Sequence, residues 1–268
     1  FFDTMSQMRI TIIGGGIIGL TTACTVLKEY SNNDNLQLTI ISEEFSPNTT
    51  ADISAGFWEP YGFEDVDERI LRWAAYAYKI FLDEYFSTKA ARAGLIKLPA
   101  YILQEDEKFT KPAYADIVRH YRTLDQHEIG LFDHVKPKNG FVFQSVVVEI
   151  SKYLPQLRYF LQRDRRVKFI KRKIHSISEL KDKADVVINC TGLASRFLVP
   201  DETVRPARGQ VTRKFVFIRF SRFYFLESDH SCACSMDKIH VPILYRRRNG
   251  LCNPSRRYSR SWWNISIK

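Results

Sequence analysis

The sequence lacks long apolar runs, paired cysteines and strong compositional bias. Of its 268 residues, 45% are hydrophobic and 26% are charged. These values are near the globular average and exclude a disordered chain, a collagen-like repeat and a disulfide miniprotein. No apolar run approaches the roughly 20 residues needed to span a bilayer, and the start of the chain lacks the charged flank and apolar stretch of a secretory signal. We therefore expect a soluble intracellular protein with no membrane partner.

Cysteine and histidine are also poorly placed for a metal site or a disulfide framework. Cys24 and Cys190 are isolated in apolar surroundings, and no two cysteines have zinc-like spacing. We interpret these two as buried thiols in a reducing compartment. His120, His127 and His134 are seven residues apart, so they cannot meet on one helical turn. No metal site is expected.

The net charge of +10 belongs almost entirely to the end of the chain. Residues 1–210 contain 28 basic and 27 acidic residues, whereas the last 58 residues contain 12 and 3. The arginines of this tail come with no recognisable nucleic-acid-binding motif. We therefore expect no nucleic-acid partner.

A glycine-rich turn follows the first predicted strand. Residues 9–13 form a β-branched run typical of a buried parallel strand, and residues 14–19 read Gly-Gly-Gly-Ile-Ile-Gly, a G-x-G-x-x-G motif. Residues 20–30 predict a helix, and residues 36–41 predict a second strand. Because these elements occur in this order, they indicate a dinucleotide-binding βαβ unit. The motif alone does not separate FAD from NAD.

Each residue of this unit has a physical role. Gly14 permits the tight turn, Gly16 lets a pyrophosphate approach the backbone, and Gly19 allows close helix–strand packing. The start of the helix offers unpaired N–H groups and a partial positive charge to the phosphates. Glu43 and Glu44, which follow the second strand, can accept the ribose hydroxyls. The alternative for the two glutamates is a solvated loop.

The middle of the chain reads as a loop followed by mixed elements. Residues 48–61 are small and hydroxyl-bearing, then aromatic, which fits a loop against a cofactor or an ordinary surface loop with a helix cap. Residues 67–87 predict an amphipathic helix, residues 96–104 a strand and residues 114–121 a helix. An apolar stripe on the first helix is expected to pack in the core; it comprises Ile70, Trp73, Ala77, Ile80, Phe81 and Tyr85.

A second strand–helix–strand pattern follows Asn139-Gly140. Residues 141–148 and 167–170 predict strands, residues 151–163 predict a helix, and residues 171–173 are a basic run that we interpret as a solvated edge. Residues 184–192 then predict a buried strand that ends in Thr-Gly, where backbone can touch a dinucleotide. Two nucleotide-contacting strands separated by an inserted segment favour FAD over NAD.

With these residues in hand, the sequence resembles the FAD-dependent D-amino-acid oxidase family, which includes D-amino-acid and D-aspartate oxidases. The matching stretches are residues 9–19, 45–50, 52–61, 185–192 and 208–210. The resemblance implies an α/β fold: a Rossmann-like FAD-binding domain built from discontinuous segments, with an inserted α+β substrate domain. The predicted segments are 8–61 and 139–210 for FAD binding and 62–138 for the substrate domain, which continues past residue 211.

The resemblance also implies a set of FAD contacts. They are Gly14, Gly16, Ile17, Ile18, Gly19, Glu43, Glu44, Thr49, Thr50, Ala55, Gly56, Phe57, Ile174 through its backbone, Thr191 and Gly192. Where the family often carries Asp-Arg, this chain has Glu43-Glu44, so a cationic contact to the adenosine is lost. Residues 58–60 resemble the neutral-substrate branch and place Glu59 near the substrate pocket, whereas residues 192–196 resemble the aspartate branch. The substrate class stays open.

The chemistry implied by the resemblance is oxidative deamination. Hydride passes from the Cα of a D-amino acid to the flavin, O2 reoxidises the flavin and yields peroxide, and the imino acid hydrolyses to a 2-oxo acid and ammonia. The implied partners are a small D-amino acid and O2, and a homodimer is left open. A peroxisomal or cytoplasmic location is expected, although this chain ends without the peroxisomal tripeptide.

The resemblance stops near residue 211, where a basic tail begins. Trp262-Trp263 must be encoded TGG TGG, and the same DNA read one base later encodes Gly-Gly, as in a strand that the family carries at about this distance. We hypothesise that residues 211–268 are a frame-shifted, aberrant reading that replaces the rest of the substrate domain. No catalytic residue is then assignable, and we expect poor folding and no turnover. The alternative is a truncated product that binds flavin without catalysis.

Overall fold

The computed structural model describes side chains within residues 7–206 and three strands beyond them. The described side chains lie in residues 7–60, 67–132 and 136–206, and the backbone alone is described for the strands β8 (Lys214–Phe220), β9 (Phe223–Asp229) and β10 (Ile243–Arg246). The two tryptophans that motivate the frame-shift hypothesis lie outside the described residues, so the hypothesis stays a prediction.

The chain divides into two compact units, which we describe separately. The first unit comprises residues 1–54, 92–94 and 150–209, and the second comprises residues 55–91, 95–149 and 210–268. Among the described residues, no helix is both long and apolar enough to cross a bilayer.

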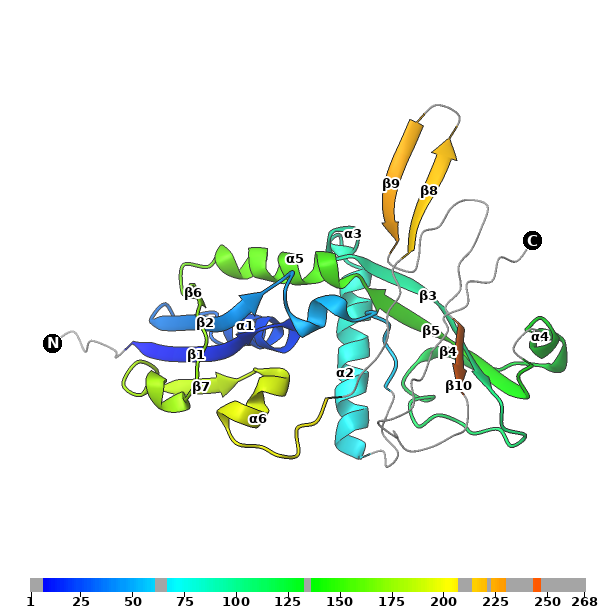
Figure 1. Cartoon of the computed structure of the whole chain (residues 1–268), viewed down its shortest axis with the longest axis horizontal. Helices are drawn as coiled ribbons and strands as arrows, with labels where there is room; N and C mark the ends of the chain where they lie inside the picture. Colours follow the sequence, from blue (N-terminus) through cyan, green and yellow to red (C-terminus); the bar gives the residue numbers. More distant parts are fainter. Residues whose placement is uncertain are drawn as a thin grey trace. The chain divides into compact units, whose positions relative to one another are not determined.

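A parallel sheet forms the centre of the first unit (Figure 1). Its strand order is β6-β2-β1-β7, and every neighbouring pair is parallel. The strands are β1 (Met8–Gly15), β2 (Leu36–Phe45), β6 (Val167–Lys171) and β7 (Val186–Asn189). Strand β1 pairs with β2 on one side and with β7 on the other. The order of strands therefore changes direction at β1, and open α/β sheets bind ligands at such a switch point.

Two helices bury one face of this sheet. Helices α1 (Ile17–Glu29) and α5 (Ile150–Gln162) contact each other and share one apolar cluster with β1 and β2. The fully buried side chains of this cluster are Ile12, Leu20, Ala23, Leu38, Ile40, Leu154 and Leu161. The predicted strand–turn–helix–strand order is therefore observed, but α1 begins at Ile17, three residues earlier than predicted, so Gly19 lies inside the helix.

The other face of the sheet is less covered. Ile13, Ile41 and Leu180 form a smaller cluster there, next to the short helices η2 (Ile177–Leu180), η3 (Gly192–Ala194) and α6 (Ser195–Leu198). The strand predicted at residues 184–192 is present as β7, but its predicted burial is wrong, since Val186 is 42% exposed. The physical reason is that β7 is the last strand of the described sheet and has β1 as its one partner.

A mixed sheet forms the second unit, with strand order β10-β3-β5-β4. Strand β5 (Asn139–Val148) pairs antiparallel with β3 (Leu95–Gln104) and β4 (Arg119–Thr123). Helix α2 (Glu68–Tyr85) contacts β3 and β5. The remaining described helices are short: α3 (Ala90–Ala93), α4 (Gln126–Gly130) and, in the first unit, η1 (Thr50–Ile53). Because β5 pairs with β3, this strand belongs to the second unit, whereas the sequence grouped residues 139–210 together.

Two local predictions in the second unit are wrong. Trp73 and Ile80 of the predicted apolar stripe are 66% and 39% exposed, and the buried side chains of α2 are Tyr78 and Leu82 instead. The Tyr78 hydroxyl donates to the Gln144 carbonyl at 2.6 Å, which turns this face of α2 toward β5. The helix predicted at residues 114–121 is a turn followed by β4, and His120 has a φ of 57°, which no α-helix accommodates.

We predict that neighbouring residues of α5 differ sharply in their contribution to stability. Leu161 is fully buried, whereas Phe160 is 56% exposed. Leu161→Ala should lower the free energy of unfolding by about 2–5 kcal/mol, because it leaves a cavity between α5 and the sheet, and Phe160→Ala should change it by less than about 1 kcal/mol. Urea denaturation of both variants measures this difference; equal losses would contradict the assigned packing of α5.

Candidate cofactor-binding site

The turn between β1 and α1 is closed so tightly that two of its glycines cannot carry a side chain. Gly14 has a φ of +121°, and a Cβ on it would lie 2.2 Å from the carbonyl oxygen of Cys190. A Cβ on Gly19 would lie 1.9 Å from the carbonyl oxygen of Gly14. Both residues are therefore fixed as glycine by backbone packing, as the sequence predicted for the turn and for the helix–strand contact.

Gly16 differs from these two glycines because the space beside it is open. A Cβ on Gly16 would have no atom within 4 Å. Gly16 is the N-cap of α1, and no side chain of the described residues caps that helix. The first N–H groups and the positive end of the helix dipole thus face an open position, and Ile18 beside them is 63% exposed. This geometry fits a phosphate-bearing group such as the FAD pyrophosphate.

Strand β2 runs further than predicted and is joined to the glycine turn. It extends to Phe45, so Glu43 and Glu44 lie in its last residues and not after it. Ser42 Oγ accepts the N–H of Gly15 at 2.9 Å and donates to the carbonyl of Glu44 at 2.6 Å. This hydroxyl therefore fixes the position of the turn relative to the two glutamates.

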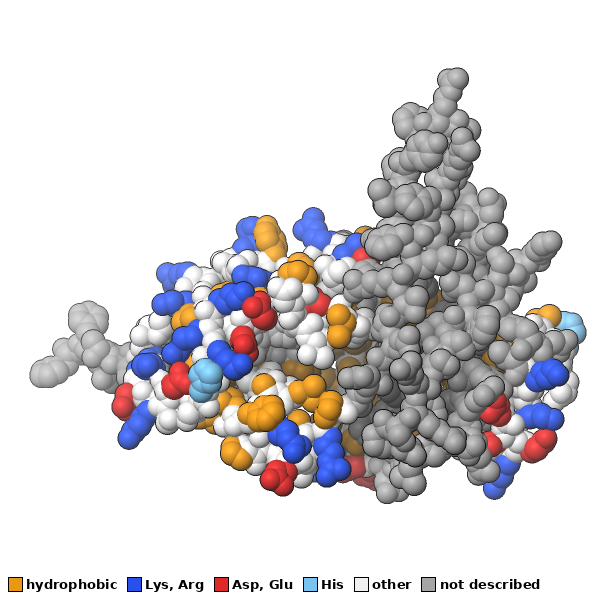
Figure 2. Space-filling model, viewed as in Figure 1, with side chains coloured by type: hydrophobic (Ala, Val, Ile, Leu, Met, Phe, Trp, Pro, Cys, Tyr) orange, Lys and Arg blue, Asp and Glu red, His pale blue; other side chains and the backbone are white. Residues whose placement is uncertain are grey.

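Each acidic residue at this strand end is paired with a lysine from the neighbouring β6 edge. Glu43 Oε1 lies 3.0 Å from Lys173 Nζ, and Glu44 Oε2 lies 2.9 Å from Lys171 Nζ. The Lys171 ammonium holds the pKa of Glu44 below its usual value. Arg172, between the lysines, pairs with Glu179 at 3.2 Å. Each cation of the basic run 171–173 is thus paired with its own carboxylate. Figure 2 shows acidic and basic side chains interspersed on the first unit.

A buried carboxylate organises the loop after β2. Asp52 is 7% exposed and accepts hydrogen bonds from the Ser46 hydroxyl at 2.6 Å and from the Thr49 N–H at 2.8 Å. The Thr49 hydroxyl also donates to Asp52, and the two residues form a capping box at the start of η1. Thr49 and Thr50, which were predicted to contact FAD, therefore lie in a short helical turn held by Asp52.

The end of β7 supplies the last predicted contacts of the first unit. The Thr191 hydroxyl donates to Asn189 Oδ1 at 2.7 Å. Gly192 has a φ of +57°, and a Cβ there would meet no atom within 4 Å. The N–H of Cys190 donates to the carbonyl of Ile13 at 2.8 Å and so holds this segment beside the glycine turn. Ile174 packs on the apolar cluster of Ile13 and Ile41 at the same end of the sheet.

The two cysteines predicted to be buried are only partly buried. Both Cys24 and Cys190 are intermediate in exposure and pack against the main cluster of the first unit. Partial burial raises the pKa of the Cys190 thiol, which disfavours the reactive thiolate. Their assignment as packing residues is consistent with these surroundings. Within the described part of the chain, no group of three or more His, Cys, Asp and Glu residues could hold a metal ion.

The remaining predicted residues belong to the second unit. Gly56 has a φ of +69°, and a Cβ on it would lie 1.9 Å from the carbonyl oxygen of Val148. The N–H of Trp58 donates to the carbonyl of Val146 at 3.0 Å, and Phe57 forms a bridge with Val147, so residues 56–58 run along β5. Ala55 precedes this segment.

Glu59 follows the same segment and has an assigned partner. Its Oε1 accepts a hydrogen bond from the Tyr114 hydroxyl at 2.9 Å. Tyr114 is itself 4% exposed and lies against Trp58, with ring centroids 6.1 Å apart. The carboxylate predicted to lie near the substrate is thus held by a buried aromatic residue of its own unit.

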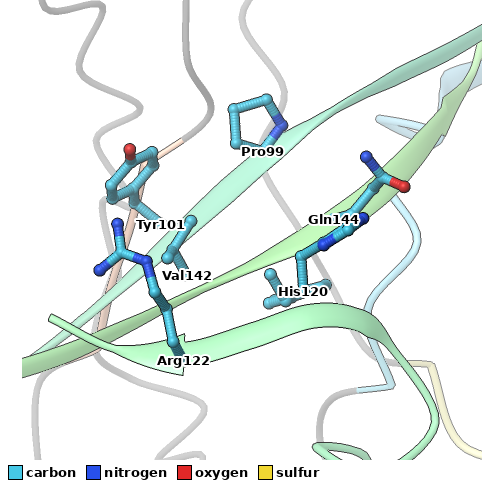
Figure 3. A pocket seen from close by; sticks show the side chains of 7 residues that line it. Pro99, Tyr101, His120, Arg122, Val142 and Gln144 are labelled. Atoms are coloured by element: carbon cyan, nitrogen blue, oxygen red, sulfur yellow. The ribbon is translucent and has the colours of Figure 1, made fainter.

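A shallow hollow lies on the sheet of the second unit (Figure 3). It has a volume of about 260 Å³ and is lined by Pro99, Tyr101, His120, Arg122, Val142, Phe143 and Gln144. The Arg122 guanidinium is already bound to both carboxylate oxygens of Glu128, at 2.6 and 2.7 Å. Because its cation is compensated, the hollow offers no strong anion site.

Sequence reasoning missed four residues that shape the first unit's strand ends. They are Ser42, Asp52, Lys171 and Lys173. The sequence marks the lysines as part of a basic run after the predicted strand 167–170, but it does not reveal their glutamate partners, which lie about 130 positions away. Asp52 carried a local signal, because Thr49 and Asp52 have the T-x-x-D spacing of a capping box. Ser42 gave none, because its bond to the Gly15 N–H depends on how the two strands pair.

The chain matches a protein-family model described as FAD dependent oxidoreductase over residues 9–217. This span includes the glycine turn, the strand ends and the second unit up to β8. The chain belongs to the FAD dependent oxidoreductase family. Its cofactor is accordingly FAD, and its α/β fold with a parallel sheet is that of an FAD-binding oxidoreductase.

Two named relatives match most of the chain. A D-amino acid oxidase of Dugesia ryukyuensis is 29% identical over 87% of this chain and 69% of the relative, and the D-aspartate oxidase of Homo sapiens is 30% identical over 77% and 60%. The chain thus spans about two thirds of the length of these relatives. Among solved structures, iminodiacetate oxidase from Chelativorans sp. BNC1 is similar over 72% of this chain and 57% of its own, with 16% identity and a TM-score of 0.46.

We predict that alanine at Gly16 and at Gly19 acts on different properties. The open space at Gly16 should accept a Cβ without loss of stability, but the methyl group would occupy the position of the pyrophosphate and weaken FAD binding about tenfold or more. Gly19→Ala should destabilise the fold itself, because its Cβ meets the Gly14 carbonyl. Thermal unfolding and FAD fluorescence titration of both variants distinguish the two effects; a destabilised Gly16→Ala with normal FAD affinity would contradict the assignment.

We predict an acid-sensitive contribution from Glu128. The Arg122 guanidinium lowers the pKa of Glu128 from 4.5 to about 2 in the folded chain. Because the folded pKa lies below the unfolded one, this stabilisation is complete above pH 4.5 and is lost as the pH falls toward 2. Wild type should therefore exceed Glu128→Gln in stability at pH 7, and the two should converge near pH 2. Glu107→Gln, at a carboxylate that is 84% exposed, is the control for loss of one negative charge; a gap that persists at pH 2 would refute the explanation.

Proposed function

We propose that the first unit binds FAD across the carboxyl ends of its strands, and that the parent gene, read in the frame without the shift, encodes an oxidase of D-amino acids that uses O2. The observation that supports this most directly is the open position beside Gly16 at the uncapped start of α1, in a chain that belongs to an FAD-dependent family. The names of the two relatives support a D-amino acid as the substrate.

Each described residue would have a defined task toward the cofactor. The N–H groups at the start of α1 would bind the pyrophosphate, and Gly16 would let it approach. Glu43 would accept hydroxyls of the adenosine ribose, while Ser42 keeps the glycine turn in register with it. Thr191 and Gly192 would present backbone at the end of β7. When bound, flavin supplies the acceptor for the substrate hydride and the route of the electrons to O2.

The substrate side rests on Glu59 in the second unit. Its carboxylate, held by the Tyr114 hydroxyl, would attract the ammonium group of a D-amino acid and repel a second carboxylate on the side chain. This charge favours neutral D-amino acids over D-aspartate. The resemblance of residues 192–196 to the aspartate branch favours the opposite, so both substrate types belong in the test.

We further propose that the 268-residue chain as written binds flavin without turning over substrate. The family-model match ends at residue 217, within the basic tail, and we assign no catalytic residue to the tail. A non-catalytic flavin-binding product is the second candidate function. The peroxisomal or cytoplasmic location and the homodimer stay predictions.

Peroxide production tests both parts of this proposal. The chain as written, loaded with FAD, is compared with a version in which the reading frame downstream of residue 210 is shifted by one base. D-Asp, D-Ala and D-Pro are the substrates, and their L-enantiomers are the controls. We expect peroxide from at least one D-amino acid with the shifted frame and none with the chain as written.

The outcomes separate the claims. Turnover by the chain as written would refute the proposal of inactivity and support the oxidase function. A shifted-frame protein that binds FAD yet oxidises none of the D-amino acids would contradict the substrate class. Sequencing the transcript through codons 205–268 shows which of the two proteins is made.

A further inference from the structure

Two lysines bring positive charge to the strand end where the sequence indicated that a cation is missing. The family resemblance places an Asp-Arg pair at the end of the second strand, and this chain has Glu43-Glu44 there. Lys173 pairs with Glu43 at 3.0 Å, and Lys171 pairs with Glu44 at 2.9 Å. The cations therefore come from the neighbouring β6 edge and not from β2.

Backbone pairing fixes where these lysines lie. Lys171 is the register partner of Ser42 in the parallel β2–β6 pair. The N–H of Arg172 donates to the Ser42 carbonyl at 2.8 Å, so the two strands stay hydrogen-bonded for one residue after β6 ends. Lys173 comes next in the chain and lies at the carboxyl ends of the parallel strands, the edge at which such sheets bind dinucleotides.

The two ion pairs differ in what else holds the carboxylate. Glu44 Oε2 is also within 3.4 Å of Asn48 Nδ2, and the Glu44 carbonyl accepts from Ser42. Glu44 is thus tied into its own loop. Glu43 contacts Lys173 through Oε1, and among the described residues its Oε2 has no hydrogen-bond partner. One oxygen of Glu43 is held while the other is available to a ligand.

We propose that Lys173 is a positioning residue for the adenosine half of FAD. Its ammonium holds Glu43 Oε1 and leaves Oε2 available to accept the vicinal hydroxyls of the ribose. Glu44 and Lys171 form a structural pair that does not touch the ligand. This inference rests on the proposed FAD binding and adds a residue that determines the affinity for its adenosine half.

The exposure of the pair makes the inference testable without unfolding the protein. The side chains of Lys173 and Glu43 are 55% and 59% exposed, and exposed ion pairs add little to fold stability. Lys173→Met should therefore keep the unfolding midpoint of wild type. Lys171→Met is the matched control, because it removes the same charge two residues away. The Lys171 side chain is 64% exposed.

Equilibrium binding to the full chain provides the test. FAD is the first probe, ADP represents the adenosine half, and FMN lacks the adenosine. We expect Lys173→Met to raise the Kd for FAD and ADP about tenfold, the size expected for a charge-assisted hydrogen bond, and to leave FMN binding unchanged. Lys171→Met should change each Kd by less than about twofold, and Lys173→Arg should recover most of the affinity.

The results distinguish this inference from the proposed function. If wild type binds neither FAD nor ADP, FAD binding by this chain is refuted. If wild type binds both and Lys173→Met matches wild type or Lys171→Met, the role of Lys173 is refuted while FAD binding stands. An equal loss for FMN would also refute it, because the effect would then be one of general charge. Lys173→Gln replaces Lys173→Met if the latter shifts the unfolding midpoint.

Discussion

The contact between the glycine turn and the end of β7 is the constraint on which the first unit depends. The Gly14 backbone lies so close to Cys190, and Gly19 so close to Gly14, that neither position has room for a Cβ. This closeness sets α1 directly on the sheet and points its first N–H groups at the open space beside Gly16. The packing of the turn therefore decides where a dinucleotide can bind, before any side chain takes part.

Charge at the neighbouring strand ends complements that backbone site. The three consecutive cations of residues 171–173 each pair with a different carboxylate, so the edge carries alternating charge with little net excess. A helix N-terminus attracts phosphate, whereas paired glutamates offer acceptors to hydroxyl groups. The two kinds of group lie at one edge of one sheet. In the proposed site, the first suits the diphosphate of FAD and the second suits the ribose hydroxyls.

The sequence predicted the first unit well because its signals are local. The β-branched residues 9–13, the spacing of Gly14, Gly16 and Gly19 and the helix that follows depend on neighbours in the chain, and the structure contains all of them. Predictions that depended on tertiary contacts were weaker. Trp73 fitted an apolar stripe but is exposed, since hydrogen bonding by Tyr78 turns α2 another way. The lysine–glutamate pairs join residues about 130 positions apart, which periodicity cannot detect.

The most direct test of FAD binding by the first unit is amide hydrogen exchange of the chain with and without FAD. Slower exchange on adding FAD is expected at residues 14–19, 42–45 and 190–192, the turn and strand ends that carry the proposed site. Exchange in the hollow lined by His120 and Arg122 should stay the same. Protection confined to residues outside those three segments, or no change at saturating FAD, would contradict the account.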